Sequence, residues 1–429
     1  MLEKFPTKNH LDASLALRGF ACLMVVNIHC NPPRNALFYQ SYNLSWLTFS
    51  HGPVAVWIFF VLSGYLMGKA FYTERYTADV QGVLNFWRNR AIRILPLYYF
   101  AVFILCLFVY TEIFKIEYWG YLIRVCTFTY HSQMVSQQIP FDYALWSLST
   151  EIQFYILIPF LYNFFRHRLM NQKHILLAAV CVIGVTFVLK LIAWISFRNQ
   201  ISEQMEYAFK YWYAPLSNSL ELFFCGFLIN PLLKYQHLNR LKISNNFKWL
   251  NSSKKIISVI LLLVLYLLTA YHLYHQELWG LIGRPSGWRT STTIFILQPL
   301  TAIITSFFIF AFESEDYYGF TKNEKLSFAT ILRNPFRILE ILGNLSYGIY
   351  IWHMPIIGKI TPIFTSDIPI EAFYNRLTAT TILSTALAVI TYYLVEIPAA
   401  RWKIYRPSQN ITHQLIKEKE ILWTSKHKD

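Results

Sequence analysis

Long apolar runs alternate with short polar segments along most of the chain. A helix that crosses a bilayer needs about 20 mostly apolar residues, and ten runs approach that length. Several contain Pro, Gly or Ser, which helices tolerate inside a membrane. The pattern therefore predicts an all-α membrane protein, a polytopic bundle of about ten transmembrane helices. The predicted spans are residues 12–30, 52–71, 94–112, 145–165, 174–196, 213–233, 255–275, 293–312, 338–360 and 377–398.

The basic residues are divided unevenly between the two sets of connecting segments. If the N-terminus lies in the cytoplasm, 26 of the 38 Lys and Arg residues fall on cytoplasmic segments and eight on outer loops. This bias is the usual signature of cytoplasmic loops, so we predict that both termini are cytoplasmic. Residues 1–398 would form the membrane domain, and residues 399–429 a basic cytoplasmic tail. The apolar run 118–130 is short and contains Arg124, so we expect it to be interfacial or re-entrant.

Composition excludes the soluble and disordered classes of protein. Hydrophobic residues make up 55% of the chain and charged residues only 14%, against about 25% charged in soluble domains. The net charge of +15 follows from the loop bias, so it does not indicate a nucleic-acid partner. The six cysteines are scattered without metal-ligand spacing, and we expect neither a disulfide framework nor a metal site. No cleavable signal peptide is expected.

A few ionisable residues lie inside the apolar runs, where their cost makes a functional role the first hypothesis. Arg18 and His29 share the first run. Eleven residues correspond to three helical turns plus about 20°, so the two side chains lie on one face, about 16 Å apart. The alternative is that Arg18 reaches the interface and that His29 is a lone core histidine.

The fourth run carries a polar stripe formed by Ser147, Glu151 and Tyr155 at four-residue intervals. Glu151 and His29 both fall in the outer half of their helices, which allows a histidine–carboxylate pair. Such a pair would fix the imidazole tautomer and raise its basicity. The alternative is an interhelical hydrogen bond with only a structural role. Glu221 is also buried in an apolar run.

Three further residues, Arg90, Arg93 and His353, are candidates for a functional role. Arg90 and Arg93 are three residues apart, a spacing that suits paired hydrogen bonds to phosphate; ordinary cytoplasmic charge or lipid headgroup contact is the alternative. His353 also falls in the outer half of its span, where an interfacial histidine beside aromatic residues is the alternative.

Taken in order, several segments resemble the acyltransferase-3 family of integral membrane acyltransferases. They cover residues 11 to about 400, and the chain departs from the pattern only where residues 13–16 lengthen the opening. The segments are Leu17-Arg18-Gly19-Phe20-Ala21, Phe59-Phe60-Val61-Leu62-Ser63-Gly64-Tyr65-Leu66, Arg90-Ala91-Ile92-Arg93-Ile94-Leu95-Pro96, Trp146-Ser147-Leu148, Glu221-Leu222-Phe223-Phe224-Cys225-Gly226, Leu345-Ser346-Tyr347-Gly348 and Trp352-His353.

The resemblance implies transfer of an acyl group, often acetyl, from cytoplasmic acyl-CoA to a hydroxyl group. Typical acceptors are O-antigen of lipopolysaccharide, peptidoglycan, exopolysaccharide or a lipid-linked sugar. Acyl-CoA (acetyl-CoA) would be a co-substrate rather than a permanently bound cofactor. The expected location is the cell inner (plasma) membrane, with lipid as a further partner.

The resemblance also implies roles for individual residues. His29 would be the general base or take the acyl group itself, and Glu151 would orient it. Four cations would bind the donor: Arg18, Arg88, Arg90 and Arg93. Four residues would shape the acceptor side: Trp146, Ser147, Tyr347 and His353.

A proton-coupled transporter of a sugar or organic anion is the alternative function, because buried Arg, His and Glu residues suit it as well. Transporters often contain inverted repeats, and the two halves of this sequence show no such similarity. Acyl-CoA hydrolysis, or incorporation of labelled acetyl groups by membranes, would distinguish an acyltransferase from a transporter.

Overall fold

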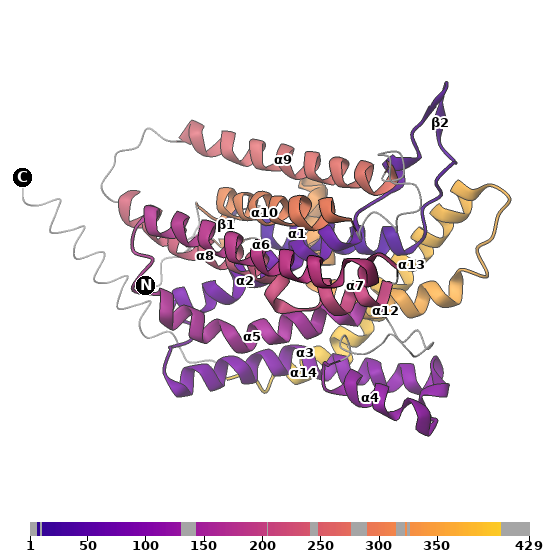
Figure 1. Cartoon of the computed structure of the whole chain (residues 1–429), viewed down its shortest axis with the longest axis horizontal. Coiled ribbons are helices and arrows are strands. Elements are labelled where there is room, and N and C mark those ends of the chain that lie inside the picture. Colours follow the sequence, from indigo (N-terminus) through magenta and orange to yellow (C-terminus); the bar gives the residue numbers. More distant parts are fainter. Residues whose placement is uncertain are drawn as a thin grey trace, which may run out of the picture.

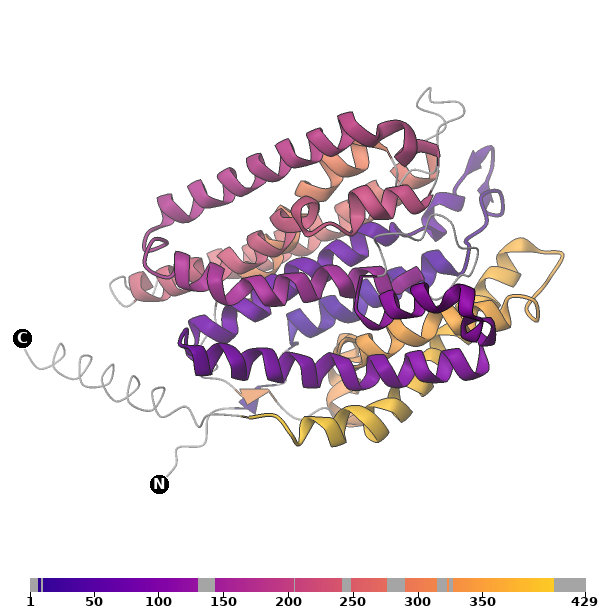
Figure 2. The same cartoon turned by 60° about the horizontal axis from the view of Figure 1, so that its bottom comes forward.

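Most of the described chain is helical. The computed structural model describes residues 7–8, 11–129, 143–203, 205–240, 248–275, 290–314, 322–323 and 327–404. The long helices run roughly alongside one another (Figure 1). In Figure 2, α3 (purple) and α6 (magenta) lie at opposite edges of the bundle, with the indigo N-terminal helices between them.

The α-helices, in chain order, are α1 (Ala13–His29), α2 (Gly52–Tyr72), α3 (Val80–Phe108), α4 (Trp119–Cys126), α5 (Trp146–Phe165), α6 (Gln172–Glu203), α7 (Met205–Ala208), α8 (Leu216–Arg240), α9 (Lys248–His275), α10 (Gln298–Glu313), α11 (Phe328–Arg333), α12 (Ile338–Ile360), α13 (Pro369–Thr391) and α14 (Ile397–Ala400).

Strands are few and short within the described residues. β1 (Thr7–Lys8) pairs in parallel with β4 (Lys322–Asn323). β2 (Phe38–Tyr39) and β3 (Tyr42–Asn43) form an antiparallel hairpin, which projects beyond the ends of the helices (Figure 1). Short π-helical turns at Phe209–Tyr213, Thr293–Leu297 and Tyr392–Glu396 adjoin α7, α10 and α13.

Seven helical stretches are long and apolar enough to cross a membrane. The other three predicted spans coincide with α1, α5 and α12, the helices that carry His29, Glu151 and His353; their crossing stays a prediction. The short run 118–130 contains only α4 and η3 (Ile116–Tyr118) within its described part, too short to span. The seven stretches are Ser45–Tyr72, Val80–Phe108, Gln172–Ile201, Leu216–His237, Ser253–His275, Thr293–Glu313 and Pro369–Ala400.

Helix α3 begins well before the predicted span at residues 94–112. The carboxylate of Asp79 accepts a hydrogen bond from the backbone N–H of Gly82 at 3.2 Å and so caps the helix. A capped start satisfies an orphan N–H of the first turn, and the helix then continues without a break through Pro96. The predicted boundary was therefore wrong, and the arginines before residue 94 lie on a helix.

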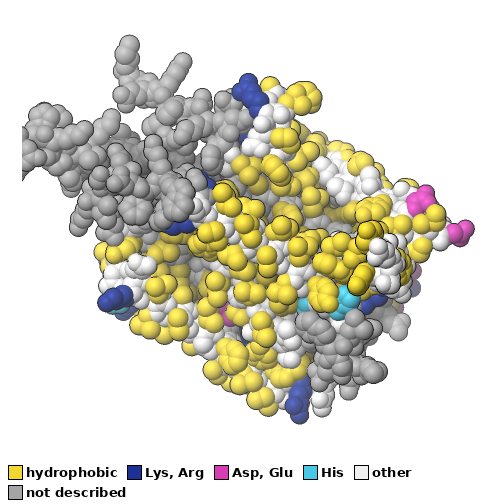
Figure 3. Space-filling view, turned by 90° about the horizontal axis from the view of Figure 1, so that it is seen from above, with side chains coloured by type: hydrophobic (Ala, Val, Ile, Leu, Met, Phe, Trp, Pro, Cys, Tyr) yellow, Lys and Arg dark blue, Asp and Glu magenta, His cyan; other side chains and the backbone are white. Residues whose placement is uncertain are grey.

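The flank of the bundle is apolar. Figure 3 shows hydrophobic side chains over most of this face, with charged side chains mainly towards its ends. Helix α6 exposes Val180, Ile192 and Ile195 at 67%, 56% and 67% of their surface. An uncovered apolar surface of this kind is expected of a bundle whose solvent is lipid.

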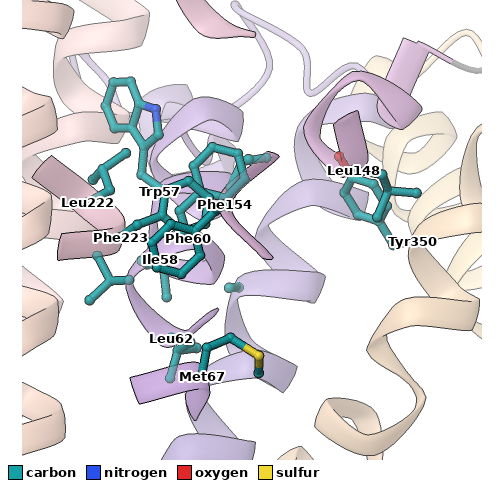
Figure 4. Close-up of a cluster of buried hydrophobic side chains, with 14 of the residues drawn as sticks. Trp57, Ile58, Phe60, Leu62, Met67, Leu148, Phe154, Leu222, Phe223 and Tyr350 are labelled. Atoms are coloured by element: carbon teal, nitrogen blue, oxygen red, sulfur yellow. The ribbon is translucent and has the colours of Figure 1, made fainter. Parts of the chain in front are cut away.

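Aromatic side chains fill the contact between α2, α5 and α8. The ring of Phe223 stacks on Phe60 and on Phe154, with centroids 4.6 and 4.4 Å apart. Figure 4 shows this cluster at the left, with Leu148 and Tyr350 drawn apart from it at the right. The cluster makes α2 a buried central helix against which the site is built.

Helices α1 and α12 lie in parallel contact with a constant register. A Cβ at Gly19 would lie 2.2 Å from the carbonyl oxygen of Leu339, and one at Gly343 would lie 2.0 Å from that of Leu15. Only glycine permits two helix backbones to approach this closely, as at small-residue interfaces in membranes. The same register brings Cys22 beside Ser346, 324 positions apart in the sequence.

We expect the substitution Gly343→Val to destabilise the protein by about 1–3 kcal/mol or more, because a side chain there forces the two backbones apart. Gly358→Val is the matched control, since a Cβ at Gly358 on the same helix would meet nothing within 4 Å. Thermal unfolding in detergent, followed by tryptophan fluorescence, measures both variants. Equal unfolding temperatures would contradict the close contact.

Candidate functional site

Three connected cavities lie within the bundle. The arginine cavity, about 370 Å³, is lined by five cations: Arg18, Lys69, Arg75, Arg90 and Arg93. The histidine cavity, about 350 Å³, is lined by His29, Arg34 and several aromatic residues. Between them lies a neck of about 50 Å³.

The neck shares residues with both cavities. Arg18 and Glu151 line the neck and the arginine cavity. Val56 and Tyr350 line the neck and the histidine cavity. The three volumes therefore adjoin one another in the order arginine cavity, neck and histidine cavity, and the neck is the smallest of the three.

Helix geometry explains which of the α3 arginines face the arginine cavity. Arg90 and Arg93 are three residues apart and share a face, and both line the cavity. Arg88 is rotated by about 200° from Arg90. It is exposed and its guanidinium donates to the carbonyl of Trp402 at 3.4 Å. The prediction that Arg88 joins the other cations is therefore not supported by its position.

The cations of the arginine cavity differ in their partners. Arg93 forms an ion pair with Glu396, and Lys69 forms one with Glu313 at 2.8 Å. The Nε atoms of Arg18 and Arg90 are buried without a hydrogen-bond partner in the part of the chain that the structure describes. A buried donor without a partner is costly, so these two side chains are the ones suited to an anionic ligand.

A further cation, Lys403, lies beside this group just after α14. Burial lowers the pKa of Lys403 below its usual value, and the positive charges of Arg93, Arg90 and Arg75 lower it further. Burial and the neighbouring positive charges therefore both disfavour the protonated form of Lys403. A phosphate-bearing ligand would relieve that repulsion.

Glu151 lies at the neck and not beside His29. Its carboxylate accepts hydrogen bonds from Ser63 and from Tyr155, the latter at 2.5 Å. Ser63 is 11 residues, about 16 Å, along α2 from Gly52, which lines the histidine cavity. No hydrogen bond joins Glu151 to His29 among the described residues, so the predicted histidine–carboxylate pair is wrong.

His29 instead pairs with His353. The Nδ1 atom of His29 lies 2.9 Å from Nε2 of His353, and the rings stack with centroids 5.1 Å apart. Their sequence separation of 324 equals the register set at Gly19 and Gly343. The contact of α1 with α12 therefore selects the partner of His29.

The four residues expected on the acceptor side occupy different places relative to these cavities. Trp146 lines the histidine cavity. Ser147 lines the neck, with its hydroxyl 2.8 Å from that of Tyr350. Tyr347 lines the arginine cavity and the neck. His353 is fully buried behind His29 and lines none of the three cavities.

Glu221, the other acid that the sequence places inside an apolar run, belongs to an ion pair. Glu221 on α8 accepts a hydrogen bond from Lys190 on α6, and both side chains are 1% exposed. Neither residue lines the three cavities. Mutual neutralisation of this kind allows two charged groups to lie in an apolar bundle.

Sequence reasoning missed several residues of these cavities. Lys69, Arg75 and Ser63 also line the arginine cavity. A signal was available for Lys69, because it is a cation inside the predicted span 52–71. Tyr350 carried no sequence signal, since tyrosine is common in membrane helices.

Comparison with known proteins places these features in a family. The family model described as "Acyltransferase domain" matches residues 12–395. The relative named O-acetyltransferase OatA, of Staphylococcus aureus (strain NCTC 8325 / PS 47), is 23% identical over 419 residues, which cover 92% of this chain and 58% of the relative. No solved structure matches the chain.

A second relative comes from Bacillus subtilis (strain 168) and is named putative peptidoglycan O-acetyltransferase YrhL. It is 25% identical over 415 residues, which cover 93% of this chain and 56% of the relative. The chain thus spans little more than half the length of the curated relatives that it matches.

Proposed function

The chain belongs to the acyltransferase family, and from this premise we propose that it is a membrane O-acyltransferase that moves an acetyl group from acetyl-CoA to a hydroxyl group of a cell-surface glycan. The names of the two relatives, both O-acetyltransferases and one of them for peptidoglycan, support the acetyl group and the glycan acceptor. The observation that carries the proposal is the series of adjoining cavities that runs from a group of cations to a histidine.

The arginine cavity suits the phosphate-bearing end of the donor. Arg90 and Arg18 have buried Nε donors without a partner in the described residues, and guanidinium groups bind phosphate through paired hydrogen bonds. The distance along α1 from Arg18 to His29 is about 16 Å. A donor held at Arg90 therefore needs an extended, uncharged arm to reach His29, and the pantetheine arm of CoA has that form.

The cationic cavity opens at the end of the bundle where α3 begins and where the chain reaches Ile404, whose backbone bonds to Asn89. The bias of basic residues assigns this end to the cytoplasm, where acetyl-CoA is made. The histidine cavity then faces the outer side, where cell-surface glycans lie. The proposed topology thus separates donor and acceptor across the membrane.

At the histidine, the reaction is a simple acyl transfer. Nε2 of His29 removes the proton of the acceptor hydroxyl as the oxygen attacks the thioester carbonyl. The new C–O bond forms, the C–S bond breaks, and the proton passes to the sulfur, which leaves as the thiol of CoA. Glu151, held by Ser63 and Tyr155, acts at the neck as the counter-charge of Arg18 rather than on the histidine.

The neck is the smallest of the three volumes, at about 50 Å³. Phe59 lines this neck, and its ring contacts that of Tyr350 with centroids 6.5 Å apart. The bulky, charged end of the donor would therefore stay in the arginine cavity, and only the slender pantetheine arm with its acetyl group would enter the neck.

The proposal is tested with membranes that contain the protein and [14C]acetyl-CoA. We expect label to enter the glycan fraction as base-labile ester, and His29→Ala to reduce it by at least about 10²-fold through loss of the base. His167→Ala is the control, because His167 is exposed and lines none of the three cavities. A transporter would give no label, and full labelling by His29→Ala would exclude the proposed role of His29.

Donor binding is tested by removing single arginines of α3. Arg90→Ala should raise KM for acetyl-CoA by about 10- to 100-fold, the value of a charged hydrogen bond, with kcat changed little. Arg88→Ala, two residues away on the opposite face, should leave KM within about twofold. Initial rates across a range of acetyl-CoA concentrations decide this, and equal effects of the two substitutions would refute the assignment.

A further inference from the structure

His353 is positioned to control the chemistry of His29 without touching a ligand. It is fully buried, it lines none of the cavities, and its Nε2 lies 2.9 Å from Nδ1 of His29. His29 is partly exposed and lines the histidine cavity. The imidazole of His29 therefore lines the histidine cavity, and the imidazole of His353 contacts it on its buried side.

The proton positions in this pair follow from the carbonyl of Tyr350. Nδ1 of His353 lies 2.6 Å from that oxygen, and a carbonyl oxygen can only accept, so Nδ1 of His353 carries a proton. A neutral imidazole has a single N–H, so Nε2 of His353 is an acceptor. It then requires the N–H of its neighbour, so Nδ1 of His29 is the donor.

These proton positions determine the state of Nε2 of His29. With the proton of His29 on Nδ1, Nε2 holds a free lone pair. No hydrogen bond engages this atom among the described residues, and His29 lines the cavity, so Nε2 is the nitrogen available to an acceptor hydroxyl. In an unrestrained imidazole the proton could occupy either nitrogen, and only one of the two tautomers leaves Nε2 basic.

We propose that His353 is a positioning residue that fixes the Nδ1–H tautomer of His29, with the carbonyl of Tyr350 as its anchor. The inference rests on the proposed function, and it assigns to His353 the orienting role that the sequence suggested for Glu151. It also assigns a residue expected to bind the acceptor to a position behind the catalytic imidazole.

A neutral partner suits the surroundings of His29. A carboxylate beside His29 would place an additional charge in an apolar bundle, at a cost of a few kcal/mol. The imidazole of His353 orients His29 without that charge. When Nε2 of His29 takes a proton, its Nδ1 proton can shift towards Nε2 of His353, so that the positive charge is shared between two rings.

The tautomer can be measured directly and without catalysis. The full-length protein, labelled with [15N]histidine in detergent, contains 12 histidines, and the His29 signals are assigned by their absence in His29→Ala. We expect the 15N shifts of wild-type His29 to report protonation at Nδ1, and those of His353→Leu to move towards protonation at Nε2. A wild-type His29 protonated at Nε2 would overturn the inference.

Kinetics then show whether the tautomer matters. His353→Leu should lower kcat for acetyl transfer from acetyl-CoA by roughly 10- to 100-fold, the range found when the partner that orients a functional imidazole is removed, with KM for acetyl-CoA unchanged. His353→Gln places an amide oxygen where Nε2 lies, so it should recover most of kcat. The unfolding temperatures of the two variants are compared in the same detergent.

The outcomes separate the inference from the proposed function. If the 15N shifts show the expected tautomer but no membrane transfers acetyl groups, the function fails and the assignment of the pair stands. If acetyl is transferred but His353→Leu retains wild-type kcat, or if the Leu and Gln variants lose kcat equally, His353 does not position His29 and the inference is overturned.

Discussion

The close backbone contact between α1 and α12 is the constraint on which the rest of the site depends. Gly19 and Gly343 leave no room for a side chain between the two helices, so the helices meet in a single register. That register brings His29 to His353 ten residues further along α1, and it places both rings at the same depth. The geometry of the histidine pair is thus a consequence of packing at two glycines distant from the imidazoles.

The ionisable groups in the bundle fall into two classes that differ in their partners. Lys190 is neutralised by Glu221, and Arg93 by Glu396, in ion pairs that link separate helices. Arg18 and Arg90 each have a buried Nε donor without a partner in the described chain. An unsatisfied buried donor costs free energy. An anionic ligand beside Arg18 and Arg90 would supply the hydrogen-bond acceptors that the described chain does not.

The neck separates the arginine cavity from the histidine cavity. Charged groups occupy the wide cavity on one side of it, and the imidazole pair lies on the other. A passage of about 50 Å³ is too small for a nucleotide. In the proposed reaction, this arrangement keeps the charged part of the donor out of the apolar middle of the bundle, where its desolvation would be most costly.

The sequence by itself determined the helices, their apolar flanks and the inventory of buried polar residues, because these depend on local hydrophobicity and on a period of 3.6 residues. It also indicated the family, which the family model confirms, and it singled out Arg18, His29 and Arg90 as candidate residues whose roles stay predictions. Only the tertiary structure decided which residues meet. Glu151 bonds to Ser63 and His29 to His353, because periodicity fixes the face of a helix but not its neighbour, and because interhelical register is set by backbone contacts far from the residues concerned.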